Sequence, residues 1–573
     1  MYKYEIKSLT FKNRTRITLG RINVLVGANN CGKTQVLKDI SAIVSGENVN
    51  NVLIDELEEQ IPNSFEEIAN VYKLNIRNAN GRENLIHLNP KLENAVTTIS
   101  GANIKNAINN SIAEKRYFHS VIGPGIVTYL NTENRLILSK SRTTNDPLIN
   151  GAQSLLDTLF LSGNNAINTV RKIVKKIFNK DIYLDYTGLG HLKIRFGDDF
   201  LNIPNNPIDA LPELAKYQLL DNQGDGIRSI VGIISALVAV KRPMILIDEP
   251  EAFLHPPQAM QLGQHISQLV KDDQQIIIAT HSADFLRGLL SSTRDAVIIH
   301  MDRSQNDDMH VNVLDSGTLN EIIYDPLLSS SRVLEGMFYK GVVITEADAD
   351  STFYQRAFQN VGAADEIHFV HAHNKQTIKK LLIPYEKLGI KHAAITDIDI
   401  IREEEDLKNL ITIADANLKN IILQNRLKIL EEVQKRSKFD ILNNLLSKLE
   451  KVSKIPSFAE EESESILINI KRELKKICKE SSEFYELKKI GYKALNGETL
   501  NAFNSLYKDC ASIGLFIVKV GELESWLEDY DYPRLSDKSK WITGALEKIF
   551  DMTPDRNKEL WKFIYELKDY LIN

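Results

Sequence analysis

Two sets of side chains in this chain have the types and spacing that phosphate chemistry requires. The first set lies in the segment GANNCGKT, residues 27–34, which fits the pattern of a glycine-rich phosphate loop ending in lysine and a hydroxyl residue. The Lys33 ammonium would reach the β- and γ-phosphates of ATP, and the Thr34 hydroxyl would ligate Mg²⁺. The residues whose backbone would close around the phosphates are Asn29, Asn30 and Gly32.

Two apolar strands that end in polar residues complete this candidate ATP site. The run MILIDEP at 244–250 ends in two carboxylates: Asp248 suits the water shell of Mg²⁺, and Glu249 is placed to polarise the attacking water. The run IIIATHS at 276–282 ends at His281. Solvated acids also cap ordinary buried strands, and a lone histidine is usually structural. Their presence after a phosphate loop favours the nucleotide site.

The second set consists of six carboxylates that follow three apolar strands in the second half of the chain. Because the carboxyl ends of parallel strands line one crevice of an α/β sheet, these acids would converge. Oxygen ligands without cysteine or histidine suit Mg²⁺, Mn²⁺ or Ca²⁺ rather than zinc. Each acid alone would more often be a solvated surface residue, but together they predict a metal site. They are Glu346 and Asp350 after GVVIT, Asp397 and Asp399 after HAAIT, and Glu522 and Glu524 after LFIVKV.

The elements that must position these side chains alternate between strands and helices. In the first half, a strand at 22–26 precedes the phosphate loop, a helix begins near Thr34, and residues 50–215 are mixed in pattern. Further along we expect a helix at 226–240, a strand at 244–247, a helix at 256–271 and a strand at 276–279.

A second α/β unit begins near Gly341. Its expected strands lie at 341–345, 392–396 and 515–520. The stretch at about 403–500 is rich in Glu, Lys and Leu and nearly free of glycine, which predicts a helical hairpin or bundle inserted into this unit.

Length and composition place the chain among soluble multidomain proteins. At 573 residues it is too long for one hydrophobic core, and 43% hydrophobic and 25% charged residues are ordinary for a globular protein. The formal net charge of −6 excludes a uniformly basic nucleic-acid binder, although not a local basic groove. Three distant cysteines, no apolar run long enough to span a membrane and no signal-peptide pattern predict a cytoplasmic protein.

The first set of motifs resembles the ABC-type ATPases of the SMC and RecF kind. The segment EPEAFLHP at 249–256 is similar to their loop after the acid pair, and His281 matches their switch histidine. The resemblance implies that two ATPase heads share each nucleotide through a signature loop, and hence at least a dimer. The candidate loop is NQGDGIRS at 222–229, with Gly224 ahead of a helix. It departs from the usual Leu-Ser-Gly-Gly-Gln, and an ordinary helix start is the alternative.

The second set resembles the Toprim domain of topoisomerases, primases and OLD-family nucleases, which carries a glutamate after one strand and Asp-x-Asp after a later one. The order ATPase then Toprim, with GELESWL at 521–527 and DKSKW at 537–541, is similar to the OLD family of ATP-dependent endonucleases. The resemblance implies that the six acids hold two metals, with Glu346 as a ligand or the general base. It also implies that Lys540, or its neighbour Lys538, steadies charge on the scissile phosphate.

Two positions depart from the family pattern. Ala347 follows the first glutamate where the family usually has glycine, and Asn374-Lys375 stands in place of Gly-Lys. We expect both changes to alter loop backbone rather than metal ligands.

Together these features predict an α/β protein of two parts. An ABC-type P-loop ATPase would occupy 1–335, with an inserted mixed or helical region at about 50–215. A Toprim domain would occupy 336–573, with the long helical insertion at about 403–500.

The function that follows is an ATP-regulated, divalent-metal-dependent DNA endonuclease or nickase, with ATP and Mg²⁺ as cofactors, and the resemblance to the OLD family implies a role in anti-phage defence. Expected partners are DNA, a second copy of the chain, and a helicase or a reverse transcriptase with its DNA product. Two alternatives are an ATP-driven DNA clamp with a non-cutting Toprim domain, and a topoisomerase- or primase-like enzyme, for which no strand-cleaving tyrosine domain is evident. A basic helical pattern at 169–180 predicts either DNA phosphate contact or a solvated face. Its cations are Arg171, Lys172, Lys175, Lys176 and Lys180.

Overall fold

The structure is a computed structural model, and its described residues form two compact units, Met1–Pro326 and Leu327–Asn573. The second unit includes the short helix η2 (Val333–Phe338), whose Val333 carbonyl oxygen accepts a hydrogen bond from the Tyr385 hydroxyl at 2.9 Å. The residues described are 4–47, 50–62, 64, 67, 76–79, 82–88, 96–110, 115–144, 146–147, 152, 154–188, 190–240, 242–293, 295–303, 308–314, 316–325, 333–434, 438–453, 463–480, 484–535 and 538–572.

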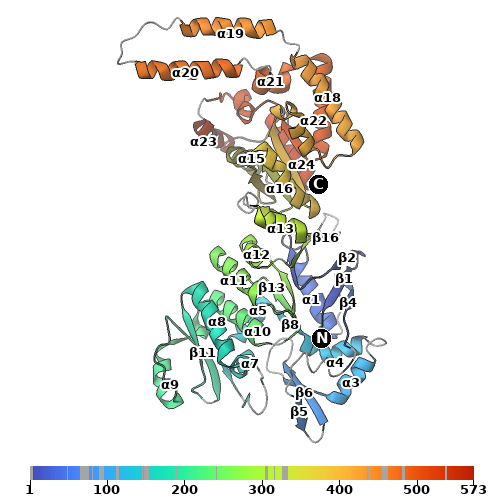
Figure 1. Ribbon diagram of the computed structural model, residues 1–573, viewed down its shortest axis with the longest axis vertical. Coiled ribbons are helices and arrows are strands. Elements are labelled where there is room, and N and C mark those ends of the chain that lie inside the picture. The colour runs from blue at the N-terminus through green and yellow to red at the C-terminus, as the bar shows by residue number, and fades with distance from the viewer. Residues whose placement is uncertain are drawn as a thin grey trace. The chain divides into compact units, whose positions relative to one another are not determined.

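A six-stranded sheet forms the centre of the first unit (Figure 1). Its order is β16-β15-β3-β14-β13-β8, and neighbours run parallel except for the antiparallel pair β15 and β16. Every residue of β3, β13 and β14 is buried, as expected for strands covered on both faces. The strands are β3 (Ile22–Val26), β8 (Val127–Leu130), β13 (Met244–Asp248), β14 (Gln275–Ala279), β15 (Ala296–Arg303) and β16 (Met309–Leu314).

Helices join these strands where the sequence predicts them. Helix α1 (Lys33–Val44) follows the phosphate loop, α10 (Asp225–Ala239) precedes β13, and α11 (Pro256–Leu269) and α12 (Ala283–Leu290) flank β14 in the chain. The expected helices and strands of this region are confirmed to within two residues. Because β3, β13 and β14 are parallel, the phosphate loop, the acid pair and His281 all emerge at one edge of the sheet.

The rest of the first unit is mixed, with three antiparallel sheets of short strands. The sheets are β2-β1-β4, β5-β6-β7, and β10-β11-β12 with β9 paired to β11. Their strands are β1 (Ile6–Phe11), β2 (Arg16–Thr18), β4 (Ile54–Glu59), β5 (Ile76–Ala79), β6 (Arg82–Leu88), β7 (Val96–Ser100), β9 (Arg142–Thr143), β10 (Asp181–Asp185), β11 (His191–Gly197) and β12 (Gln218–Leu219). The accompanying helices are α3 (Gly101–Asn109), α4 (Lys115–Ile126), α5 (Thr132–Leu138), α7 (Leu155–Leu161), α8 (Gly163–Phe178), α9 (Pro207–Ala215) and α13 (Ser316–Tyr324).

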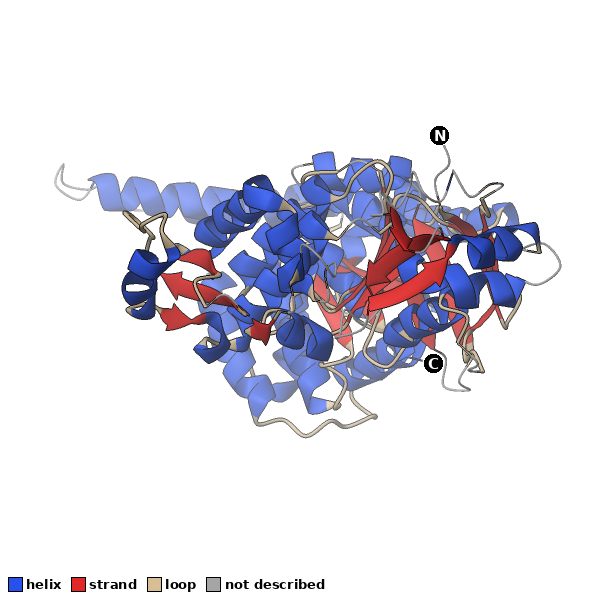
Figure 2. Ribbon diagram, turned by 90° about the horizontal axis from the view of Figure 1, so that it is seen from below, coloured by secondary structure: helices blue, strands red, loops and turns tan. Residues whose placement is uncertain are grey.

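The second unit contains a parallel sheet of order β18-β17-β19-β20, with helices packed on it. Figure 2 shows the helices of the chain in blue around the red strands of its sheets. Three of its strands are those expected, although β20 stops two residues early, and β18 has no counterpart in the sequence prediction. The strands are β17 (Gly341–Thr345), β18 (Ile367–His371), β19 (Lys391–Asp397) and β20 (Leu515–Val518). The helices are α15 (Asp348–Asn360), α16 (Lys375–Lys387), α22 (Gly497–Ser512), α23 (Lys538–Phe550) and α24 (Glu559–Ile572), with the short helices η3 (Ile398–Ile401), η5 (Gly491–Ala494) and η6 (Leu523–Tyr530).

The helical insertion (residues 403–500) follows β19 and runs into the start of α22; its described part consists of helices joined by short turns. Helix α18 packs against α22, and its buried residues include Ile422, Arg426 and Ile429. Helices α19 and α20 lie side by side, away from the sheet of this unit (Figure 1). The helices are α17 (Glu404–Leu410), α18 (Ala416–Gln434), α19 (Lys438–Ser453), α20 (Ser463–Glu480) and α21 (Tyr485–Ile490).

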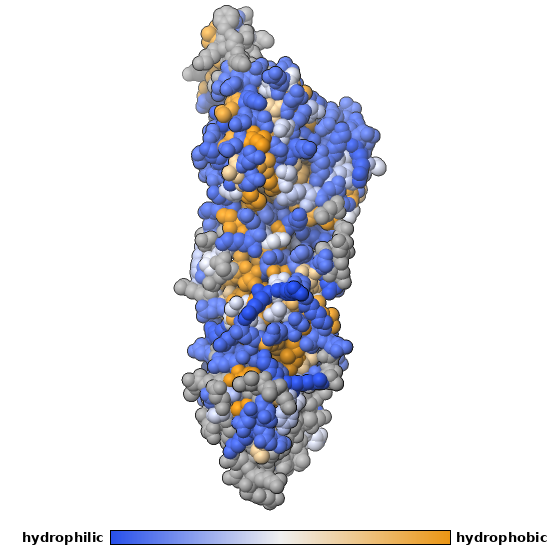
Figure 3. All heavy atoms as spheres, turned by 90° about the vertical axis from the view of Figure 1, so that its right-hand side faces the viewer, coloured by the Kyte–Doolittle hydropathy of each residue, from blue (hydrophilic) through white to orange (hydrophobic). Residues whose placement is uncertain are grey.

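Within the described ranges, no helix is both long enough and apolar enough to cross a membrane. The face drawn in Figure 3 is largely hydrophilic, with apolar residues in patches between charged and polar ones. The most exposed large apolar side chains described are those of Ile208, Leu201 and Phe550.

Candidate functional site

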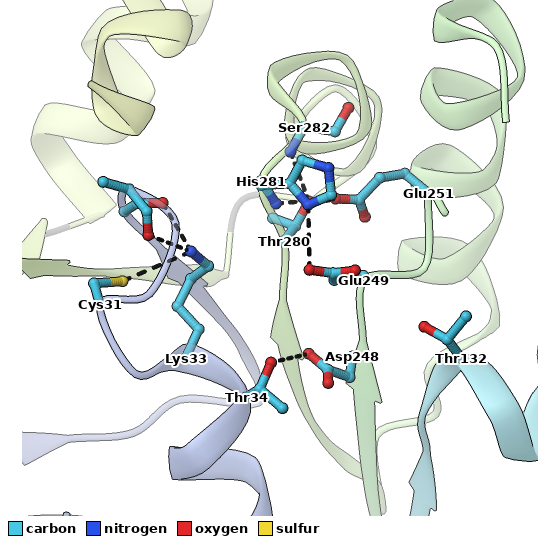
Figure 4. Close-up of polar contacts among 12 residues, drawn as sticks. Cys31, Lys33, Thr34, Thr132, Asp248, Glu249, Glu251, Thr280, His281 and Ser282 are labelled. Carbon is cyan, nitrogen blue, oxygen red and sulfur yellow. Dashed lines mark hydrogen bonds and ion pairs between the residues drawn. The ribbon is translucent and has the colours of Figure 1, made fainter. Parts of the chain in front are cut away.

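The phosphate loop follows β3 and leads into α1 (Figure 4). Gly27 and Gly32 have φ of 144° and 103°, and a Cβ on Gly27 would lie 2.1 Å from the Met301 carbonyl oxygen. Lys33 is only 8% exposed, and its Nζ donates to the carbonyl oxygens of Gly27 at 2.8 Å and Ala28 at 2.9 Å. The ammonium therefore lies inside the loop, where the phosphates of a nucleotide would meet it.

Asp248 faces this loop from the end of β13. The Thr34 hydroxyl donates to Asp248 Oδ1 at 3.0 Å (Figure 4), and the Tyr129 hydroxyl donates to Oδ2 at 3.4 Å. Burial raises the pKa of Asp248, and the neighbouring Glu249 charge adds to that effect. Thr34 and Asp248 thus form a hydroxyl–carboxylate pair of the kind that can bind Mg²⁺ in P-loop ATPases.

Two carboxylates lie beside His281. The Glu249 side chain is 44% exposed, with its Oε1 3.6 Å from His281 Nδ1 (Figure 4). Glu251 is buried; its Oε1 lies 3.2 Å from the same Nδ1 and accepts from the Thr280 hydroxyl at 2.7 Å. Burial raises the pKa of Glu251. His281 therefore lies closer to the buried Glu251, and the more exposed Glu249 stays open to the site. Glu251 was not predicted from the sequence; its signal is the second glutamate in Asp-Glu-Pro-Glu.

Arg135 on α5 holds the backbone of the acid pair. It is fully buried, and its guanidinium donates to the carbonyl oxygen of Asp248 and, at 3.0 Å, to that of Glu249. Glu249 has φ of 47°, in the left-handed region that side chains other than glycine rarely adopt. Burial lowers the pKa of Arg135 to about 10, so it stays charged at neutral pH. Arg135, also missed in the sequence, therefore stabilises the strained backbone that aims Glu249.

Replacing Arg135 by lysine is expected to slow ATP hydrolysis by about tenfold while ATP affinity changes little. The ammonium keeps the charge but cannot bridge both carbonyl oxygens, so Glu249 would lose its fixed orientation. Steady-state hydrolysis and fluorescent-nucleotide binding would measure the two quantities. Arg287→Lys, at a half-exposed arginine of α12, is the matched control. A parallel loss of binding and turnover would show that Arg135 only supports folding.

The candidate signature loop opens α10. Gly224 is the residue that precedes the helix, and a Cβ there would meet no atom within 4 Å, so its surroundings are open. A Cβ on Gly226 would lie 2.6 Å from the Phe253 carbonyl oxygen, which ties this loop to the one after the acid pair. Asp225 carries a negative charge in the first turn and pairs with Arg228 at 2.9 Å. Contact of Gly224 with a second subunit's nucleotide remains a prediction.

In the second unit, Glu346 and Asp397 meet at the carboxyl edge of the adjacent strands β17 and β19. The Asp397 backbone N–H donates to Glu346 Oε1 at 3.4 Å. Burial raises the pKa of Glu346 to about 7, and nearby Asp399 and Asp350 contribute. Burial, followed by the charges of Glu346, Asp350 and Asp399, also raises the pKa of Asp397 well above its usual range. Four of the predicted acids are therefore close enough to repel one another.

Two lysines bind the carboxylate of Asp399. Lys375, from the first turn of α16, contacts Oδ1 and lies 4.0 Å from Glu346 Oε1. Lys488, from α21, lies 2.7 Å from Oδ2. Burial acts to raise the pKa of Asp399, but the hydrogen bonds and charges of both lysines outweigh it and lower that pKa. The side chain of Asn374, which stands where the family usually has glycine, caps α16 by accepting a hydrogen bond from the Thr377 N–H at 2.9 Å. It therefore stabilises the start of the helix that carries Lys375.

Glu522 is linked to the other acids of this edge by basic side chains. Lys488 Nζ lies 3.2 Å from Glu522 Oε1, and Arg534 Nη1 lies 3.2 Å from Glu522 Oε2. The sixth acid, Glu524, lies near the same group, because its charge adds with those of Asp350 and Asp397 to the effect of burial in raising the pKa of Tyr354. Asp350 Oδ2 also accepts from the N–H of Ala347 at 3.2 Å. Lys488 and Arg534 were missed, because nothing in their local sequence marks them as neighbours of this edge.

The predicted phosphate lysine lies on α23. Lys540 is exposed in the first turn of this helix, beside the buried Trp541, whose ring stacks on Phe353 of α15 at 6.0 Å between centroids. Asp537 and the side chain of Lys538 lie outside the described residues. Contact of Lys540 with a scissile phosphate remains a prediction.

The basic face of α8 is smaller than the sequence implies. Arg171 donates to both carboxylate oxygens of Asp181, at 3.0 and 2.6 Å, and Lys180 pairs with Asp198. These two cations are therefore engaged within the fold. Exposed lysines remain at Lys172, Lys175 and Lys176.

Two family models match the chain in consecutive parts. One, described as an AAA ATPase domain, matches residues 128–286, and the other, described as an overcoming lysogenization defect protein-like TOPRIM domain, matches 337–399. The chain is an ATPase fused to an OLD-like Toprim domain. The first match includes Asp248 and His281, and the second ends at Asp399. The phosphate loop lies outside both matched ranges, so its assignment depends on the sequence pattern and geometry described above.

Solved structures similar to this chain include SMC heads. An SMC head bound to the C-terminal winged-helix domain of ScpA is 14% identical, covers 55% of this chain and 99% of its own, and has a TM-score of 0.33. The SMC head with an extended coiled coil, bound to the C-terminal domain of ScpA from Pyrococcus furiosus, is 12% identical (56% and 98% covered, TM-score 0.33). The SMC head of Thermotoga maritima is 13% identical (55% and 98%, TM-score 0.27). No curated protein matches the chain.

An ATPase fused to a Toprim domain uses a nucleotide and divalent metal ions in general, and the residues present suit both. The phosphate loop holds a buried ammonium and a Thr34–Asp248 pair. At the second edge, burial and mutual repulsion raise the pKa of both Glu346 and Asp397, and a divalent cation would relieve that repulsion. Across the described residues, no three Asp, Glu, His or Cys side chains are arranged to hold a metal ion. Lys375 and Lys488 instead provide the positive charge beside Asp399.

Proposed function

We propose that this protein is an ATP-regulated, divalent-metal-dependent DNA endonuclease or nickase. The observation that carries the proposal is the meeting of Glu346, Asp397 and Asp399 at one edge of a parallel sheet in an OLD-like Toprim domain. The chemistry that divalent ions would supply at this edge is activation of water and neutralisation of the leaving oxygen of a phosphodiester. Glu346, Asp350, Asp397, Asp399, Glu522 and Glu524 would hold these ions.

The chain's own residues supply the rest of the chemistry. Burial raises the pKa of Glu346 to about 7 in the metal-free protein, and in the loaded site this side chain would act as a metal ligand or as the general base. Lys375 approaches both Glu346 and Asp399, and this position supports a role for its charge in contacting a bound phosphate. Lys540 is a second candidate for phosphate contact.

In the ATPase domain, Lys33 and Thr34 would bind the phosphates and Mg²⁺ with Asp248, while Glu249 orients the attacking water and His281 supports it. The open surroundings of Gly224 support contact from a second copy, so we propose at least a dimer. Lys172, Lys175 and Lys176 are the exposed cations of α8 that would meet DNA phosphates. Anti-phage defence, with a helicase or reverse transcriptase as partner, is the setting we propose.

Glu249→Gln is expected to reduce ATP turnover by about 100-fold, since the amide cannot accept a proton from the attacking water. ATP binding should persist, because Lys33, Thr34 and Asp248 are unchanged. Bound and hydrolysed nucleotide would be separated by rapid filtration and chromatography. Glu133→Gln, at a first-turn acid of α5, is the control. Hydrolysis by Glu249→Gln at the parent rate would remove the role assigned to this carboxylate.

The proposed function is tested by incubating the purified full chain with supercoiled plasmid and Mg²⁺ or Mn²⁺, with and without ATP. Nicked or linear product that requires the metal, and whose rate changes with ATP, is the expected result. ATP-dependent retention of DNA without strand breaks in any metal would instead identify a clamp.

A further inference from the structure

The helical insertion returns to the acidic edge of the Toprim sheet through α21, the short helix that carries Lys488. Its Nζ lies 2.7 Å from Asp399 Oδ2 and 3.2 Å from Glu522 Oε1. These two acids follow different strands, β19 and β20. Lys488 therefore bridges carboxylates that follow two adjacent strands, and its side chain is about one-third exposed, at 32%.

Close backbone packing fixes α21 at this edge. Gly521 has φ of 114°, and a Cβ there would lie 2.3 Å from the Lys488 carbonyl oxygen. A Cβ on Gly491 would lie 2.0 Å from the Lys519 carbonyl oxygen, and the Tyr492 N–H donates to that same oxygen at 2.9 Å. Two glycines thus allow the backbone that bears Lys488 to lie directly against the backbone that precedes Glu522.

The other end of the insertion is attached to the turn that carries Asp399. Arg426 on α18 is almost fully buried, and its guanidinium donates to the carbonyl oxygens of Ile401 and Arg402, each at 2.8 Å. It also pairs with Glu404 at 3.1 Å. Those carbonyl oxygens belong to the end of η3, the turn that begins one residue before Asp399. Arg426, in the first half of the insertion, and Lys488, near its end, therefore both contact the segment 399–402.

We propose that the helical insertion is part of the nuclease site, in which Lys488 is a positioning residue that ties Asp399 to Glu522. The expected effect on DNA cutting rests on the proposed function, but the positions of Lys488 and Arg426 beside the acids do not depend on it. Arg426 holds the turn, and Lys488 sets the spacing of two carboxylates that would bind metal. A movement of the insertion, for instance on DNA binding, would then change the geometry of the acids.

Removing Lys488 should move metal affinity and cutting in opposite directions. Loss of a positive charge beside two ligands would make Mn²⁺ bind more tightly, by about fivefold for a partly solvated site. The two acids would lose their fixed spacing, so plasmid cutting at saturating metal should fall by about tenfold. Damage to the fold alone would weaken both Mn²⁺ binding and cutting. Opposite changes in these two quantities would therefore distinguish a positioning role from a loss of folding.

The experiment compares full-length parent, Lys488→Met, Lys488→Arg and Lys489→Met. Lys489 is the adjacent, exposed lysine of the same helix, near the Tyr485 ring, and serves as the matched control. Mn²⁺ binding would be followed by electron paramagnetic resonance without DNA, cutting by plasmid nicking, and backbone protection at 397–402 by hydrogen exchange. The arginine variant keeps the charge and should stay within about threefold of the parent in both binding and cutting.

Tighter Mn²⁺ binding with slower cutting and faster exchange at 397–402 in Lys488→Met, but not in Lys489→Met, supports the inference. Arg426→Lys should also raise exchange at 397–402. Unchanged Mn²⁺ affinity and exchange in Lys488→Met would overturn the inference. If the parent itself does not cut DNA, the proposed function fails, while the metal-binding and exchange results still decide whether Lys488 positions these acids.

Discussion

Lys33→Ala is expected to lower ATP hydrolysis by about 1000-fold, the loss associated with removing a group that stabilises charge in a transition state. In the structure its ammonium lies inside the phosphate loop, bonded to the carbonyl oxygens of Gly27 and Ala28. No other lysine of α1 can replace it, since the exposed Lys38 lies more than one helical turn away. The measurement is steady-state release of phosphate with saturating ATP and Mg²⁺.

Lys38→Ala is the matched control, because it removes the same charge from the same helix at an exposed position. It should hydrolyse ATP as the parent does. Equal hydrolysis by Lys33→Ala and Lys38→Ala would mean that the glycine-rich loop is not the ATP site. Because the phosphate loop lies outside the matched range of the ATPase family model, this comparison tests the part of the site that rests on pattern and geometry alone.

Most residues that the sequence identified share one local feature, because they follow a buried apolar strand; Gly224 and Lys540, at the starts of helices, do not. Asp248 and His281 end runs of isoleucine and leucine, and such runs in a parallel sheet are recognisable from a few residues. Once these strands are parallel, their ends lie at one edge. Local pattern therefore predicted the ATP site and the acids of β17 and β19. The sequence analysis did not predict strand β18, because the buried His368 interrupts its apolar pattern.

The supporting residues could not be predicted in the same way. Arg135 lies 113 positions before Asp248, and Lys488 lies 89 positions after Asp399. Each is an ordinary cation on a short helix, and only the tertiary packing brings it to the site. The same packing shows why α8 is a weaker candidate for DNA binding than its sequence implies. Asp181 lies three residues beyond the end of that helix and binds Arg171.

Neutralising both Asp397 and Asp399 as asparagine is expected to reduce plasmid cutting by about 1000-fold at any Mg²⁺ or Mn²⁺ concentration. The amides keep the size of the side chains but remove two negative charges that would offset the cations. Asp397 interacts with the charges of Glu346 and Asp350, and Asp399 is bound by two lysines, so both belong to one charge network. ATP hydrolysis should be largely unchanged, because Lys33 and Asp248 belong to the other domain.

The matched control is Asp365→Asn with Glu405→Gln, which removes two charges at exposed positions of the same domain and should cut as the parent does. In the asparagine double variant, Lys375 and Lys488 would lose a carboxylate partner, so its melting temperature must be compared with that of the parent before activity is interpreted. A folded double variant that cuts at the parent rate would place the nuclease activity elsewhere or attribute it to a contaminant. If Lys33→Ala abolished cutting and the double variant did not, the reaction would depend on the ATPase domain, and the Toprim assignment of the cutting site would be wrong.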